Sequence, residues 1–113
     1  MELKKIKSKI DELLEETEKF DFPFLASYTQ KQEILEEKKE YIYDYLLEVL
    51  GEERVKEIPL EKIWKDAKEI VDPKFGMLSE KRKMNGFYLQ EIMHEYVSII
   101  LEYILKIGVS NEK

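Results

Sequence analysis

Apolar residues recur every three or four positions through most of this chain, and that spacing is the strongest constraint on its fold. The clearest stripe consists of Leu60, Ile63, Trp64, Ala67, Ile70 and Val71. Residues three and four apart lie on one face of an α-helix, so such a stripe indicates a helix with one buried side. With only four glycines and three prolines in 113 residues, connections between helices must be short. The pattern predicts an all-α fold.

Four principal helices are predicted to form a bundle in a single domain that covers residues 1–113. The predicted helices cover residues of about 2–20, 29–50, 59–71 and 79–107. Pro23 ends the first helix, and Gly108 is the predicted end of the last. At Asn85-Gly86 we expect either a kink in the last helix or a separate short helix before Phe87. That short helix, or a helical turn within 52–57, would add a fifth helix.

The start and end of the second helix have specific signals. Either Ser27 followed by Gln30, or Thr29 followed by Gln32, has the spacing of a capping box, in which two side chains satisfy free backbone N–H groups. Gly51 is the predicted end, because glycine readily adopts the left-handed conformation that often ends helices.

The composition narrows the class of protein. Charged residues make up 39% of the chain, with a formal net charge of −6, which disfavours the surface as a whole for binding nucleic acid. The absence of cysteine removes disulfides, thiolate metal ligands and cysteine nucleophiles. Abundant Lys and Glu are typical of thermophilic proteins. Residues 1–5 do not resemble a signal peptide, and no segment is long and apolar enough for a membrane span. We therefore expect a cytoplasmic protein without membrane contact.

Two segments, 41–50 and 97–107, are apolar around most of the helix circumference. One of them could be the central helix of an irregular bundle, but two central helices are hard to arrange in a chain this small. This surplus of apolar helix surface predicts a homo-oligomer or a protein partner that covers it. Tyr41 and Tyr45 share a helix face, and Tyr43 points nearly opposite. The candidate interface residues are Tyr41, Tyr45, Val97, Leu101 and Tyr103. The leading functional prediction is a non-enzymatic interaction or assembly protein, since no catalytic signature is found.

A metal-binding bundle is one alternative function. Glu91 and His94 form a Glu-x-x-His pair, which di-metal four-helix proteins use together with a second such pair and two further Glu residues. A symmetric dimer would have to supply the second pair, with additional ligands drawn from Glu40, Asp44 or Glu48. However, the apolar stripe of this helix turns His94 towards solvent. We therefore predict no bound cofactor.

A basic patch gives the other alternative, a small subunit that contacts nucleic acid. Its basic residues are Lys74, Lys81, Arg82 and Lys83. The aromatic residues Phe75, Phe87 and Tyr88 are close in sequence, and single-stranded nucleic acid binds where basic and aromatic side chains alternate. The competing interpretation places Phe75 and Phe87 in the core and leaves the basic residues solvating a helix start.

Overall fold

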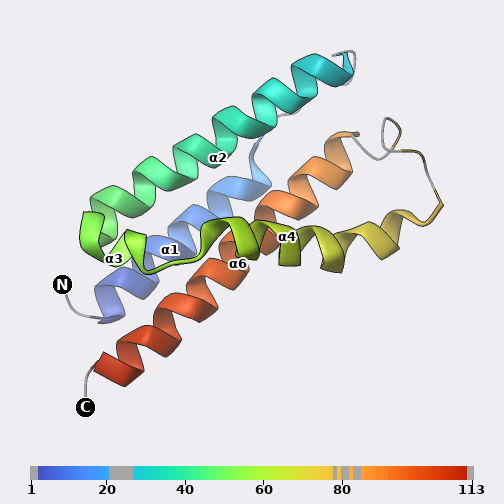
Figure 1. The fold of residues 1–113 in the computed structure, drawn as a ribbon. Coiled ribbons are helices and arrows are strands. Elements are labelled where there is room, and N and C mark those ends of the chain that lie inside the picture. The colour runs from blue at the N-terminus through green and yellow to red at the C-terminus, as the bar shows by residue number, and fades with distance from the viewer. Residues whose placement is uncertain (1–2, 21–26, 78, 80–81, 83–84, 112–113) are drawn as a thin grey trace.

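The computed structural model of the chain describes residues 3–20, 27–77, 79, 82 and 85–111, and these residues form an elongated helical bundle (Figure 1). The elements are α1 (Leu3–Glu18), α2 (Tyr28–Leu50), α3 (Glu52–Lys56), α4 (Leu60–Val71), the 3-10 helix η1 (Asp72–Phe75) and α6 (Gly86–Asn111). The described residues contain no strand, and the molecule measures 47 × 23 × 21 Å. The predicted all-α bundle with four principal helices is confirmed.

The central helix of the bundle is α6. It packs against α1 on one side and α4 on the other, and Figure 1 shows α1 running antiparallel to it. Its buried side chains are Tyr88, Leu89, Ile92, Met93, Tyr96, Val97, Ile100 and Ile104. The packing partners on α1 include Ile6, Ile10 and Leu13, and those on α4 include Ile63, Ala67 and Val71. The apolar character of α6 on several sides is thus satisfied within the chain.

Helix α2 is buried along one edge only. Its buried residues are Leu35, Ile42, Leu46 and Val49, which follow the helical spacing. Tyr41 and Tyr43 keep 45% and 40% of their surface exposed. Within the single chain, segment 41–50 is therefore not buried around its circumference, and its exposed tyrosines are left for the contact with a partner, which stays a prediction. Its apolar content comes partly from tyrosines, whose amphipathic rings tolerate a surface position.

Local signals explain the ends of α2. The Ser27 hydroxyl accepts a hydrogen bond from the Gln30 backbone N–H at 3.2 Å, and the Gln30 side chain accepts one from the Ser27 backbone N–H at 2.9 Å. This confirms the Ser27 capping box rather than the alternative at Thr29. Gly51 ends the helix with a φ of 86°, which favours glycine. The predicted turn after it is α3, whereas the predicted break at Pro23 lies outside the described residues.

The last helix begins at Gly86, in agreement with the predicted break at Asn85-Gly86 and not with a continuous helix from residue 79. Asn85 caps it, since the Tyr88 backbone N–H donates to the Asn85 side-chain oxygen at 2.9 Å. The predicted end at residue 107 is wrong. The helix continues through Gly108 to Asn111, since glycine costs a helix only about 1 kcal/mol and no proline follows. None of the helices in the described ranges is long and apolar enough to cross a bilayer.

Candidate functional site

Tyr41 and Tyr45, two of the predicted interface residues, hold α2 against α1. The Tyr41 hydroxyl donates to a carboxylate oxygen of Glu16 at 2.6 Å, and the Tyr45 hydroxyl donates to the backbone carbonyl of Lys9 at 2.9 Å. The hydrogen bond to the Glu16 carboxylate, together with burial, raises the pKa of Tyr41 to about 12. Burial raises the pKa of Tyr45 as well. These hydroxyls serve the bundle itself, so only the exposed ring edges remain for a partner.

Of the three α6 residues predicted for an interface, Val97 is corrected by the structure. Its side chain is 0% exposed within the core, where a partner cannot reach it. Leu101 and Tyr103 are half-buried and pack against the same core. The sequence could not show which of these residues are buried and which are accessible, because segment 97–107 is apolar on nearly every side. Which side faces outwards depends on where α1 and α4 pack against α6.

An elongated groove runs between α2 and α4. We name it the α2–α4 groove; it consists of two adjacent hollows of about 270 and 330 Å³ that share Glu36. The α2 wall consists of Gln32, Leu35, Glu36, Lys39, Glu40 and Tyr43. The α4 wall consists of Leu60, Trp64 and Lys68, and α6 supplies the floor of Tyr88, Ile92 and Tyr96. The groove remains because α2 packs mainly on α1 and α3 rather than on α4.

An aromatic cluster occupies the middle of the α2–α4 groove. The rings of Trp64 and Tyr96 meet edge to face, with centroids 5.1 Å apart. The ammonium group of Lys39 lies 4.5 Å from the centre of the Trp64 ring and 3.5 Å from the Glu36 carboxylate. Burial, and secondarily the negative charge of Glu36, raises the pKa of Tyr96 to about 12. An aromatic face beside a carboxylate is suited to hold a cation.

Tyr43 and Trp64 were not among the predicted site residues. Tyr43 was recognised as pointing away from Tyr41 and Tyr45, and Trp64 was assigned to the buried stripe of its helix. In the structure both line the α2–α4 groove, Trp64 half-buried and Tyr43 more exposed. The opposite orientation of Tyr43 was the available signal, but the residues facing it across the groove depend on how α4 packs.

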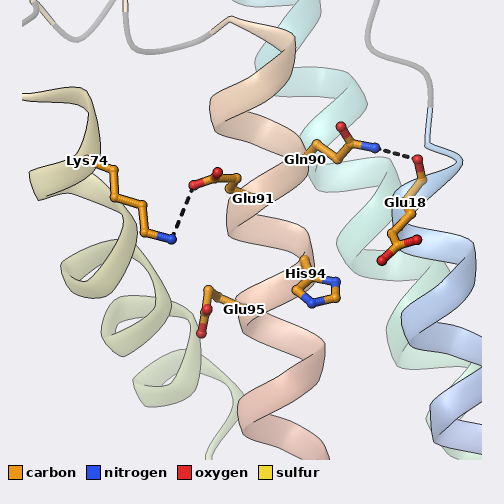
Figure 2. Close-up of a pocket in the computed structure, with 6 residues that line it drawn as sticks. All are labelled: Glu18, Lys74, Gln90, Glu91, His94 and Glu95. Carbon is orange, nitrogen blue, oxygen red and sulfur yellow. Dashed lines mark hydrogen bonds and ion pairs between the residues drawn. The ribbon is translucent and has the colours of Figure 1, made fainter.

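A separate hollow of about 240 Å³, outside the α2–α4 groove, surrounds His94 (Figure 2). Its lining residues are Glu18, Lys74, Gln90, Glu91, His94 and Glu95. Glu91 turns towards η1, where its carboxylate lies 3.6 Å from the ammonium group of Lys74. His94 turns towards α1, and the Gln90 side-chain amide donates to the Glu18 backbone carbonyl beside it. The predicted Glu91–His94 pair therefore faces two different neighbours.

His94 is half-buried, so its ring is only partly turned to solvent, and a hydrogen bond also holds the ring. Its Nδ1 atom lies 3.3 Å from the hydroxyl oxygen of Thr17, which is 0% exposed. The single Thr17 hydroxyl proton is donated to the Leu14 carbonyl at 2.6 Å. Thr17 can then only accept from His94, so Nδ1 carries a proton and Nε2 is the ring nitrogen left for other contacts.

The described residues do not bring three metal-ligating groups together. Glu40, Asp44 and Glu48, the additional ligands considered for a dimeric metal site, lie on α2 outside the hollow at His94. We expect Fe²⁺, Mn²⁺ or Zn²⁺ to raise the melting temperature by no more than about a degree or two, since weak binding to the folded state stabilises little. Thermal unfolding with and without each metal measures this. Stoichiometric metal in the purified protein, absent from His94→Ala, would contradict the expectation.

The basic patch is only partly assembled by the described residues, because Lys81 and Lys83 lie outside them. Arg82 is exposed, whereas Lys74 is paired with Glu91. Two of the nearby aromatic residues are used internally. Tyr88 is buried and donates to Asp72 at 2.7 Å, and Phe75 packs edge to face on Tyr88 with ring centroids 5.1 Å apart.

Phe87 is the exposed aromatic residue near the basic patch. Its side chain is 77% exposed, so its placement in the core is wrong, while the half-buried Phe75 does pack against the core as that interpretation expected. A single exposed ring offers less base-stacking surface than the sequence suggested. Contact with nucleic acid stays a prediction.

The chain matches no protein-family model, no curated protein and no solved structure at a significant level, so its own geometry has to support any functional conclusion.

Proposed function

We propose that this protein is a non-enzymatic interaction or assembly protein that binds another protein chain through the α2–α4 groove. The observation that carries this proposal is the groove itself, whose walls present the rings of Tyr43 and Trp64 beside a buried floor that includes Tyr88 and Tyr96. The proposed contact surface therefore differs from the one predicted from the sequence: it is the Tyr43 face of α2, opposite the Tyr41–Tyr45 face.

Two features favour the groove as a protein-binding surface. Tyrosine and tryptophan are enriched among the residues that dominate binding energy, because they bury a large area at low entropic cost. In addition, grooves between helices receive partner helices through apolar residues at three- and four-residue spacing. The distance from Leu60 to Lys68 along α4 corresponds to about 12 Å of helix, and that from Gln32 to Tyr43 along α2 to about 16 Å. The walls therefore flank about two turns of a partner helix on the α4 side and about three on the α2 side.

A displayed library of helical peptides tests the proposal. We expect the protein to enrich a family of related peptides, and we expect Tyr43→Ala to abolish the enrichment, because it removes the exposed aromatic ring from the lip of the groove without changing its charge. Glu15→Gln, on exposed α1 surface outside the groove, is the control and should enrich the same family. Identical enrichment by Tyr43→Ala would contradict binding in the groove, and enrichment of no family would contradict the proposed function.

A second copy of the chain is one candidate for the partner, in line with the predicted homo-oligomer. Sedimentation velocity at micromolar concentration distinguishes a second copy of the chain from a different protein as the partner. A dimer that Tyr43→Ala dissociates would identify a second copy of the chain as the occupant of the groove. A monodisperse monomer would mean that the occupant is a different protein. The proposed setting is the cytoplasm.

A further inference from the structure

We propose that the α2–α4 groove takes a basic amphipathic helix of a partner protein, whose Lys or Arg side chain displaces Lys39 from the face of Trp64. This inference rests on the proposed function and adds the chemistry of the partner. The geometry at Lys39, the charge of the α2 wall and the helical form of both walls support it.

Lys39 shows what the middle of the groove binds. Its side chain extends from α2 across the groove to Trp64 on α4, where the ammonium group lies 4.5 Å from the ring centre. The same group lies 3.5 Å from the carboxylate of Glu36, whose side chain is 71% exposed. An aromatic face and a carboxylate therefore already hold one cation there, and a Lys or Arg from a partner would meet the same two groups.

The α2 side of the groove is acidic beyond Glu36. Glu40 lines the groove together with Glu36, and Glu33 and Glu37 are exposed on the adjoining face of α2. Within the part of the chain that the structure describes, Glu36 is the one of these four glutamates with an ion pair. Lys39 is the basic residue of the α2 wall, and the groove floor beside Glu36 and Glu40 is apolar and aromatic. A partner with basic residues along one edge of an apolar stripe complements both features.

Because both walls of the α2–α4 groove are helices, we expect the partner segment that binds there to be a helix as well. The described residues present no strand edge to which an extended peptide could pair, and α2 and α4 are both helices. A third helix can pack its side chains between theirs, as in a bundle. Its basic edge would face the glutamates of α2, while Lys68 on the α4 wall disfavours a second basic edge on that side.

Three synthetic peptides test the charge of the partner. One has a helical Leu stripe flanked by Lys, the second has the same stripe flanked by Glu, and the third has the Lys peptide's composition in scrambled order. We expect the ordered Lys peptide to bind at least about tenfold more tightly than the other two, by fluorescence anisotropy. The emission of Trp64, the single tryptophan of the chain, reads occupation of the groove directly.

A matched pair of lysines on α2 tests the displacement of Lys39. Lys39 covers Trp64 in the groove, whereas Lys38 lies 5.1 Å from the ring of Phe20, on another side of α2. Lys39→Met and Lys38→Met remove the same charge one residue apart. We expect Lys39→Met to bind the ordered Lys peptide about threefold or more tightly than wild type, and Lys38→Met to change the affinity by much less.

The outcomes separate this inference from the proposed function. Equal binding of the Glu and Lys peptides, both weakened by Tyr43→Ala, would overturn the basic partner and keep the groove as an interface. Equal effects of Lys39→Met and Lys38→Met would overturn the displacement of Lys39. If the scrambled peptide bound as tightly as the ordered one, net charge alone would explain the binding, and the helical partner would be overturned. No binding of any peptide at low salt would overturn the whole inference.

Discussion

Val97→Asp should lower the free energy of unfolding by about 4 kcal/mol or more, enough to unfold much of a protein of ordinary stability. Val97 is 0% exposed in the middle of α6, between α1 and α4. A carboxylate there loses its hydration, and the apolar core around it offers no compensating charge. Urea unfolding followed by circular dichroism measures the change.

Phe87→Asp is the control for this experiment. Phe87 lies on the same helix but is 77% exposed, so the substitution should change the free energy of unfolding by no more than about 0.5 kcal/mol. If Val97→Asp kept its helicity and stability while changing only the oligomeric state, Val97 would be an interface residue after all, and α6 would not be the central helix of the bundle.

The wild-type protein should lose stability between about pH 10 and pH 12, and Tyr96→Phe should remove about 2 to 3 kcal/mol of that loss. Burial and the nearby charge of Glu36 raise the pKa of Tyr96 from 10.0 to about 12. Between these values an unfolded chain releases the Tyr96 proton, while the folded chain retains it. Unfolding is then favoured as the pH rises, and the stabilisation that is complete below pH 10 disappears by about pH 12.

Parallel unfolding of wild type, Tyr96→Phe and Tyr41→Phe at several alkaline pH values measures this contribution. Lysine deprotonation affects all three proteins alike, so the differences isolate the tyrosines. Tyr41 also has its pKa raised to about 12, but its ring is 45% exposed and solvent screens the interaction, so its removal should have the smaller effect. Identical pH profiles of wild type and Tyr96→Phe would contradict the raised pKa of Tyr96.

Most of the helices could be predicted because their signals are local. The capping box at Ser27 and the glycine at position 51 act within one or two turns, and the structure has both as predicted. The stripe on α4 correctly predicts the helix, but Ile70, which was part of the predicted stripe, is 48% exposed. The end of the last helix was missed for the converse reason. Gly108 resembles a stop signal, but glycine can remain helical when nothing else ends the helix.

The sequence alone determined the fold class, because apolar spacing and scarce loop residues leave a chain of this kind few alternatives to packed helices. It did not determine which of its two most apolar helices lies at the centre. Segments 41–50 and 97–107 have similar composition, and only the docking of α1 and α4 onto α6 distinguishes them. The groove could not be predicted from the local sequence either. Lys39, Trp64 and Tyr96 are far apart in sequence, and they meet only because α2 and α4 pack beside α6 without closing on each other.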